Sequence, residues 1–256
     1  MGKPIVITFA NQKGGVGKTT SAVNIAAAVG AMGHRVLLCD LDPQGNATSG
    51  VGVSKKSLKY SAYEALIGSC HPALAIYKTN FKNLWVMPST IDLAGAEIEL
   101  IEQEGREYAY KRIIDAVGED FDFIFTDCPP SLSILTVNAL SAADGVVIPM
   151  QCEYYSLEGL SQLMISIKKV KQLYNPALTI TGILITMYNG RLNLSAHVLG
   201  EIKKYYADKL FTTSVTRNVK LTEAPSFGEP IYYYDKYSKG SLAYTEIAKE
   251  LISRVM

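Results

Sequence analysis

The chain has 256 residues, of which 48% are hydrophobic and 19% are charged; these proportions exclude a disordered or fibrous protein and allow a large buried core. Its 25 basic and 24 acidic side chains give a formal net charge of +1, so binding to nucleic acid or to an anionic membrane would need a local basic patch. The four cysteines and three histidines are scattered, with no C-x-x-C or H-E-x-x-H pattern. This argues against a metal site built from them and indicates reduced cysteines in a cytoplasmic protein.

Short apolar segments alternate with longer helix-forming segments along the chain. In chain order, we expect a buried strand at 4–10, a helix at 17–33, and strands at 35–42 and 83–89. Next we expect a helix at 97–118, a strand at 121–130, a helix at 132–142, a strand at 145–151 and a helix at 156–174. The remaining elements are a strand at 178–187, a helix at 194–208, a weaker strand near 209–215 and a helix at 240–255. The least regular stretches, 43–60 and 216–240, are expected to be contact-making loops.

Strands that are apolar on both faces and alternate with helices indicate a parallel sheet covered on both sides. We therefore predict a doubly wound α/β fold, a mostly parallel sheet with helices on both faces, as a single domain over 1–256. In such folds, ligands bind beyond the carboxyl ends of the strands. No apolar run reaches the roughly 18 residues expected of a membrane-spanning helix, and the first predicted strand begins without a signal peptide. We expect a cytoplasmic protein with no membrane partner.

The sequence ITFANQKGGVGKTTSAVN (7–24) forms a glycine-rich turn between a predicted strand and a predicted helix. The usual phosphate-binding pattern, G-x-x-x-x-G-K-[ST], would have its first glycine where this chain has Gln12. The residues expected to wrap their backbone N–H groups around phosphate, at the positive end of the helix, are Gly14, Gly15, Val16 and Gly17. Lys18 would reach the β- and γ-phosphates, the Thr19 hydroxyl would coordinate Mg²⁺, and Thr20 would bond the α-phosphate. The alternative is an incidental lysine in a glycine-rich turn.

Acidic residues lie at the ends of two predicted strands. Asp40 and Asp42 close the strand at 35–42, and since residues two apart on a strand share a face, both can face the glycine-rich loop. A carboxylate there can orient an attacking water or hold a water on Mg²⁺; strand-end capping is the alternative. Asp127 follows four apolar-type residues in FIFTDCPPSLS (123–133), a form of strand that supplies a carboxylate to the hydration shell of Mg²⁺.

The octapeptide KGGVGKTT, with a lysine directly before the glycines, resembles the deviant Walker A box of the ParA/MinD group of P-loop ATPases. The resemblance implies a P-loop NTPase fold, ATP and Mg²⁺ as cofactors, and a homodimer that encloses ATP between its subunits. It also implies that Lys13 reaches the partner subunit's phosphates, as an arginine finger supplied in trans does. Asp42 is then the residue that positions the attacking water, and Asp40 lies nearer the outer shell of the metal. A solvated loop lysine is the alternative for Lys13.

The resemblance covers nearly the whole chain, because CDLDPQGNATSG, DCPPSL, QCEYYSLEGL, RNVKLTEAPSFG and PIYYYD are similar to the chromosomal ParA branch often called Soj. That branch implies a slow ATPase that binds duplex DNA non-specifically as an ATP dimer, associates with the nucleoid, and is stimulated by a ParB-like partner in chromosome or plasmid partitioning. The DNA-contacting positions of the family match Arg191 and Lys220, and Arg217 adds to them. The base-binding segment matches Thr216 and Asn218.

Two departures affect these matches: threonine stands at 216 where the family has proline, and Lys220 stands where it has arginine, which binds phosphate with a wider fork of donors. Other cations either extend the DNA-binding face or simply lie on solvated helices; they are Lys168, Lys169, Lys171, Lys203 and Lys204.

A MinD-like membrane-positioning ATPase is the main alternative, and it would need a basic amphipathic helix at the C-terminus. The final segment AYTEIAKELISRVM (243–256) is instead expected to pack as a last helix. An iron–sulfur reductase or small-molecule ligase is a further alternative, but Cys39 and Cys128 lie in or directly after buried strands. A binding module without turnover would not need the full set of Lys18, Thr19, Asp42 and Asp127.

Overall fold

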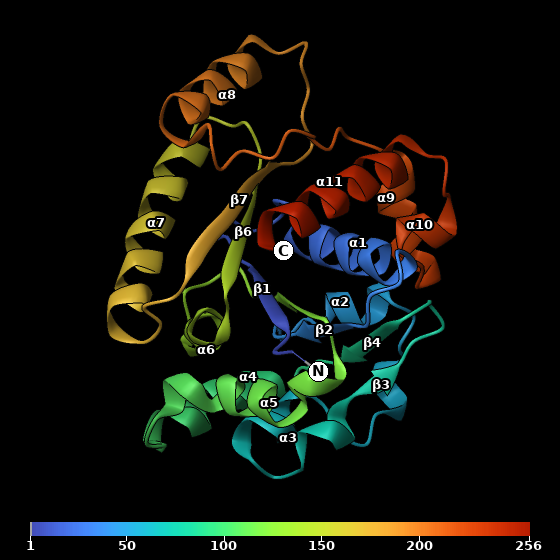
Figure 1. Ribbon diagram of the computed structural model, residues 1–256, viewed down its shortest axis with the longest axis vertical. Helices are drawn as coiled ribbons and strands as arrows, with labels where there is room; N and C mark the ends of the chain where they lie inside the picture. The colour runs from blue at the N-terminus through green and yellow to red at the C-terminus, as the bar shows by residue number, and fades with distance from the viewer. Residues whose placement is uncertain (1) are drawn as a thin grey trace.

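The computed structural model describes residues 2–256, and a seven-stranded sheet lies at its centre, in the order β3-β4-β2-β5-β1-β6-β7 (Figure 1). The strands are β1 (Ile5–Phe9), β2 (Val36–Asp40), β3 (Tyr77–Lys78), β4 (Leu84–Met87), β5 (Phe123–Asp127), β6 (Gly145–Met150) and β7 (Thr179–Ile185). Neighbouring strands run parallel except at the edge, where β3 pairs antiparallel with β4. The predicted doubly wound, mostly parallel sheet is confirmed.

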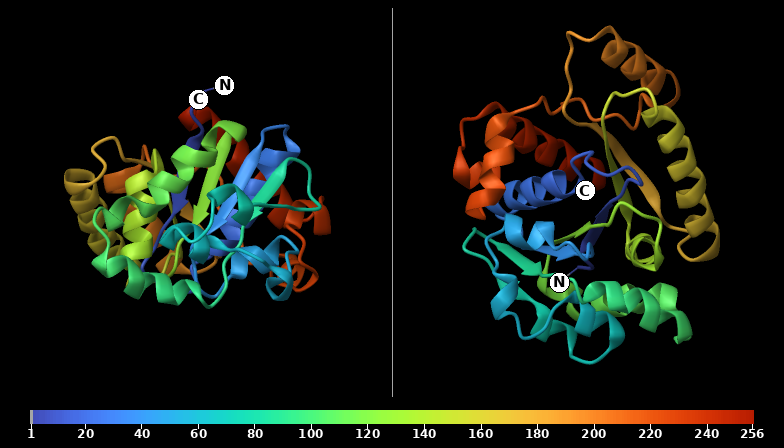
Figure 2. Two further views of the ribbon diagram at one scale, coloured as in Figure 1. Left: turned by 90° about the horizontal axis from the view of Figure 1, so that it is seen from below. Right: turned by 180° about the vertical axis from the view of Figure 1, so that it is seen from behind.

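Helices cover both faces of the sheet. On one face α1 (Lys18–Ala31) packs beside α11 (Lys239–Val255), as Figures 1 and 2 show. Shorter helices on this side are α2 (Asn46–Gly50), α9 (Val219–Glu223) and α10 (Ile231–Tyr234). The other face carries α3 (Ala62–Ile67), α4 (Leu93–Glu99), α5 (Ala109–Val117), α6 (Ile134–Ala142), α7 (Ser156–Leu173) and α8 (Asn193–Tyr206).

The core lies on both sides of the central strands, because successive strand residues point to opposite faces. On β1, Val6 packs with the α3–α8 side while Ile7 and Phe9 pack with α1 and α11. On β5, Ile124 and Phe125 divide in the same way. The uninterrupted apolar runs in the sequence therefore reflect strands that are buried on both faces.

The helix predicted at 97–118 is wrong, because the chain forms α4, a stretch of short 3₁₀ turns and then α5. A contact from a distant residue fixes the backbone where α5 begins. The Asn138 side chain on α6 donates to the Arg106 carbonyl at 2.8 Å and accepts from the Tyr110 backbone N–H at 3.0 Å. A buried amide from a distant helix therefore overrides the local helical pattern.

The weak strand predicted near 209–215 is not a strand of the sheet, because this segment forms one isolated bridge to β7, between Leu210 and Ile183. The Phe211 N–H donates to the Ile183 carbonyl at 3.0 Å, and the Val215 N–H donates to the Ile185 carbonyl at 2.9 Å. The segment bulges away between these two contacts, since β7 advances only from Ile183 to Ile185 over the same span, and this interrupts the ladder.

The two irregular stretches of the sequence, 43–60 and 216–240, come into close contact through the backbones of one glycine in each. A Cβ atom on Gly52 would lie 2.9 Å from the carbonyl oxygen of Gly228, and one on Gly228 would lie 2.7 Å from the Gly52 Cα atom. Both glycines have positive φ, at 74° and 66°, which other residues rarely adopt. Only glycine at both positions allows this approach.

Candidate functional site

The register of the central strands brings the predicted loop and acidic residues to one edge of the sheet. Asp127 ends β5 directly beside Asp40 at the end of β2. On its other side it pairs with Phe9, the last residue of β1. The chain leaves β1 at this point and enters the glycine-rich loop, which ends at the first turn of α1. The site therefore lies beyond the carboxyl ends of the strands, as expected for a doubly wound fold.

Two residues that are distant in the sequence, each just after a strand, fix the glycine-rich loop in front of α1. Gly17 caps α1 with φ 83° and supplies no side-chain hydrogen bond, so the first N–H groups of the helix are available to an anion. The Thr186 hydroxyl, just after β7, donates to the Val16 carbonyl at 2.7 Å. Gln151 donates its side-chain amide to the Gly15 carbonyl at 2.8 Å. These bonds fix the loop without using its N–H groups.

The two lysines of the loop point to different surroundings. Lys18 is only 6% exposed, and its ammonium donates to the Lys13 carbonyl at 3.1 Å inside the loop. Burial lowers the pKa of Lys18, and Asp127, Cys128 and Asp42 oppose that shift in this order. The Lys13 ammonium forms an ion pair with Glu153 ahead of α7, and both side chains are partly exposed. One cation therefore lies within the loop and the other at its outer entrance.

Asp127 and Asp40 are both buried, but their hydrogen bonding differs. Neither carboxylate oxygen of Asp127 has a hydrogen-bond partner. Burial, followed by the charge of Asp40, raises the pKa of Asp127 well above its ordinary value. The Thr19 hydroxyl is near enough to oppose part of this rise, although it makes no hydrogen bond to either oxygen. Asp40 accepts three hydrogen bonds, from Thr48 N–H, Thr48 O–H and Asp42 N–H, and burial still raises its pKa to about 6.

The donor set fits a hard divalent cation that completes its shell with phosphate and water. Such a cation accepts one or two carboxylates and a hydroxyl, which Asp127 and Thr19 offer side by side. Within residues 2–256 no group of three or more His, Cys, Asp or Glu side chains forms a cage for a metal. The buried oxygens of Asp127 lack partners, so a bound cation would satisfy them. Asp42 lies next to them, with its carboxylate accepting the Gln44 N–H at 2.9 Å.

A cavity of about 350 Å³ continues from the loop toward the segment after β7. The structure brings the predicted residues Thr20, Thr216 and Asn218 together along its wall, which Tyr244 of α11 also lines. Arg217 also lines this cavity. Asn218 accepts the Lys220 N–H at 2.8 Å and so caps α9. A planar base of a nucleotide whose phosphates lie in the loop would fit here.

The predicted DNA-contacting cations lie on different elements. Arg191 follows β7 in the turn before α8, where its N–H donates to Asn189 at 3.1 Å. Lys220 lies on α9, and its ammonium is 2.9 Å from the carboxylate of Glu223 and 5.5 Å from the centre of the Tyr234 ring. Glu223 raises the pKa of Lys220 and neutralises part of its charge. Of the three cations, Arg217 is the one that lines the cavity beside the loop.

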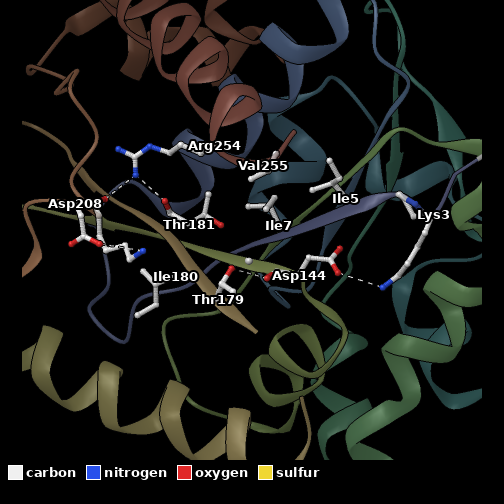
Figure 3. A pocket seen from close by; sticks show the side chains of 13 residues that line it. Lys3, Ile5, Ile7, Asp144, Thr179, Ile180, Thr181, Asp208, Arg254 and Val255 are labelled. Atoms are coloured by element: carbon white, nitrogen blue, oxygen red, sulfur yellow. Dashed lines mark hydrogen bonds and ion pairs between the residues drawn. The ribbon is translucent and has the colours of Figure 1, made fainter. Parts of the chain in front are cut away.

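A larger cavity, about 670 Å³, lies at the opposite ends of the strands (Figure 3). Asp144 and Lys3 form an ion pair at 3.3 Å on one side of it. On the other side Arg254 donates to the carbonyls of Thr181 at 2.8 Å and Leu210 at 2.6 Å. These bonds fasten the end of α11 to the edge of the sheet. The cavity is remote from the glycine-rich loop, so size alone does not identify the site.

Three residues that support the site were not singled out as site residues in the sequence. Thr186 and Gln151 hold the loop from 170 and 136 residues away. Thr48 binds Asp40, although its segment looked irregular. Thr48 and Gln151 lie in CDLDPQGNATSG and QCEYYSLEGL, two of the segments that carry the family resemblance, and Gln151 and Thr186 lie at or near the ends of predicted strands on one edge of the sheet.

A family profile described as an AAA domain matches residues 5–180. The chain is 51% identical to the sporulation initiation inhibitor protein Soj of Bacillus subtilis, over 98% of both chains. It is 46% identical to the chromosome-partitioning ATPase Soj of Treponema pallidum, over 99% of this chain and 98% of that one.

Among solved structures, cobyrinic acid a,c-diamide synthase from Mycobacterium smegmatis with bound ATP analogue and magnesium is 39% identical. It covers 97% of this chain and 94% of its own, with a TM-score of 0.85. The geometry of the loop and acidic residues agrees with these matches, and the chain belongs to the ParA/Soj family of P-loop partitioning ATPases.

Proposed function

We propose that this partitioning ATPase is an ATP-driven dimerisation switch that binds duplex DNA without sequence preference. ATP is enclosed between two subunits, and the dimer associates with the nucleoid by binding its DNA. A ParB-like partner stimulates ATP hydrolysis, after which the dimer dissociates into monomers. The observation that carries the proposal is the separation of the two loop lysines: Lys18 lies inside the loop, whereas Lys13 reaches outward to Glu153. To reach the phosphates of a second subunit from the outer entrance, the Lys13 ammonium would have to leave Glu153.

ATP and Mg²⁺ are the cofactors of this site. The N–H groups from Gly14 to Thr20 and the Lys18 ammonium would bind the phosphates, and Thr216 and Asn218 would contact the base. Thr19 and Asp127 would hold Mg²⁺, with Asp40 in its outer shell; the ion neutralises charge on the β- and γ-phosphates. Asp42 would orient the attacking water, and the partner subunit's Lys13 would neutralise charge that develops in the transition state.

DNA binding would come from cations spread over the dimer rather than from the net charge, which is only +1. We assign the contacts to Arg191, Arg217 and Lys220. Such contacts reach phosphate oxygens and carry no sequence information. Lys220 must leave Glu223 or share it, so we expect Arg191 to contribute more.

The switch is tested with Asp42→Ala, which is expected to bind ATP and to hydrolyse it far more slowly than wild type. Size-exclusion chromatography should give a dimer with ATP and a monomer with ADP, and unrelated DNA duplexes should be retained only with ATP. Retention should weaken steeply as salt rises, because bound phosphates release counterions. Monomer in both states would refute the dimer switch; a dimer that retains no DNA would refute only the DNA-binding part.

The DNA contact is tested with Arg191→Glu, using Lys111→Glu on α5 as a charge-matched control far in sequence from the loop. Arg191→Glu should dimerise with ATP as wild type does but lose DNA retention, whereas Lys111→Glu should keep both. Equal DNA affinity of the two variants would refute the assignment of Arg191.

A membrane-positioning role is less favoured by the packing of α11. Its apolar residues Tyr244, Ile247, Ala248 and Leu251 are buried against the α1 side of the core, so they are not available to enter a lipid surface. No helix among residues 2–256 is long and apolar enough to cross a membrane. Co-sedimentation with anionic vesicles in the presence of ATP would overturn this preference.

The likeness to a diamide synthase raises amide synthesis as another role for the same loop. An amide synthase that draws its nitrogen from glutamine needs a reactive thiolate. Burial raises the pKa of all four cysteines, that of Cys39 to about 12 and that of Cys152 to about 11, so the thiolate form is disfavoured. Cys39 and Cys128 are also fully buried, which disfavours an iron–sulfur cluster between subunits.

A further inference from the structure

The short helix α2 follows Asp42 and carries one fully buried polar side chain, Thr48. Its backbone N–H and its hydroxyl both donate to the same oxygen of Asp40, Oδ2, each at 2.7 Å. The other oxygen of that carboxylate, Oδ1, accepts the backbone N–H of Asp42 at 3.2 Å. One carboxylate therefore joins α2 to the backbone of the residue that would orient the attacking water.

The Thr48 hydroxyl has a second partner that fixes its direction. It accepts the backbone N–H of Ser89, just after β4, at 2.9 Å. Because Ser89 occupies the acceptor side, the hydroxyl proton must point to Asp40. Ser89 is fully buried, so its N–H would have no water to replace this bond. The hydroxyl thus connects the ends of β2 and β4 through a single atom.

We propose that Thr48 is a positioning residue for ATP hydrolysis: it holds Asp40, and Asp40 holds the backbone of Asp42. The inference rests on the proposed function, in which Asp42 orients water. Without the Thr48 hydroxyl the Asp40 carboxylate keeps only the Thr48 N–H on Oδ2, so it can turn more freely about its side-chain torsions and holds the Asp42 backbone N–H less firmly. Oδ1 has only one bond, so an outer-shell water on Mg²⁺ remains compatible with this role.

The test compares Thr48→Val, which keeps the shape and the backbone N–H but removes the hydroxyl, with Thr48→Ser, which keeps the hydroxyl. Single-turnover hydrolysis of labelled ATP with Mg²⁺ gives the rate, and equilibrium binding of ATP gives the affinity. Thr48→Val should lower the rate by about 10- to 100-fold, since small misplacement of a catalytic group has effects of this size. Its affinity for ATP should stay within about 2-fold of wild type, and Thr48→Ser should restore most of the rate.

A merely structural role is separated by introducing Thr48→Val into the Asp42→Ala protein. If Thr48 acts through Asp42, the second substitution should not lower the residual rate further, because the two effects are not additive. Melting temperatures confirm that each protein is folded at the assay temperature, and Thr48→Ala replaces the valine variant if that one does not fold.

Three results would overturn the proposal: an unchanged rate in Thr48→Val, equal loss in Thr48→Ser, or an additive loss in the Asp42→Ala background. The wild-type protein is measured first with ATP and Mg²⁺. Failure of wild type to hydrolyse ATP would remove the proposed function and this inference together, whereas normal wild-type turnover with an unaffected Thr48→Val would remove only the positioning role.

Discussion

Replacing Asp127 with asparagine should stabilise the nucleotide-free protein while removing its response to Mg²⁺ and ATP. The wild-type carboxyl is fully buried and neither oxygen has a hydrogen-bond partner. It also lies beside the carboxylate of Asp40 in the register of the sheet. Asparagine has nearly the same shape but no charge. It therefore removes the repulsion between the carboxylates of Asp127 and Asp40, and also the free-energy cost of protonating the buried Asp127 carboxyl at neutral pH.

The size of the effect follows from the cost of a buried polar group without a partner, about 1–3 kcal/mol and more for a charged one. Asparagine keeps part of that cost because its amide also lacks partners. We therefore expect a gain of about 1–2 kcal/mol in the free energy of unfolding at pH 8, which for a chain of this size corresponds to about 2–8 °C in melting temperature. Burial raises the pKa of Asp127, so more of the wild-type carboxyl is protonated at pH 5 than at pH 8, and the gain should shrink as pH falls.

Thermal melts of wild type and Asp127→Asn at pH 5 and pH 8, with and without Mg²⁺ and ATP, measure these differences. Asp115→Asn on the exposed side of α5 is the matched control and should melt within about 0.5 kcal/mol of wild type. The reasoning is refuted if Asp127→Asn melts below wild type at pH 8 without ligands, or if its gain is equally large at pH 5.

Lys18→Ala should lose ATP affinity in equilibrium binding, because it removes the cation inside the loop, while Lys111→Ala should bind normally; equal affinities would contradict the role of Lys18. Burial raises the pKa of Asp40 from 3.8 to about 6, so its folded state binds the proton more tightly than the unfolded state. The contribution of Asp40 to the stability of the nucleotide-free protein is fully present below about pH 4 and is lost as pH rises through about 6. The melting temperatures of wild type and Asp40→Asn should therefore differ by an amount that changes over this pH range. A difference that stays constant with pH would contradict the pKa shift. Gly52→Ala should destabilise the fold by about 1–3 kcal/mol, since alanine is strained at positive φ and meets the Gly228 carbonyl. Denaturant unfolding would measure this, with Gly200→Ala, whose added Cβ meets nothing within 4 Å, as the control expected to show no such loss.

The sheet and the glycine-rich loop were predictable because their signals are local. A buried strand followed by glycines and GKTT fixes the order of elements, and parallel strands bring their carboxyl ends to one edge. This rule places Asp127 and Asp40 at the same edge of the sheet, but that they are neighbours follows from the pairing of β2 with β5, which was not predicted. The roles assigned to individual site residues stay predictions until they are tested.

The features that were not predictable depend on contacts between distant residues. The break between α4 and α5 requires Asn138, which lies on another helix. The edge strand β3 has only two residues, too few to show a periodic pattern. The bond from Thr186 to the Val16 carbonyl spans 170 positions, and threonine at a strand end has no local pattern that distinguishes it from an ordinary β-former.

The contact between Gly52 and Gly228 has a consequence for how sequences of this kind can change. A side chain at either position would clash with the facing backbone unless that backbone moved away. A single substitution therefore destabilises the fold, whichever glycine it replaces. The two loops can vary in length and composition on either side of the contact, but the contact itself can be altered only by moving both backbones together. Accordingly, a protein engineered from this scaffold should treat residues 52 and 228 as one unit, and graft the two loops as a pair.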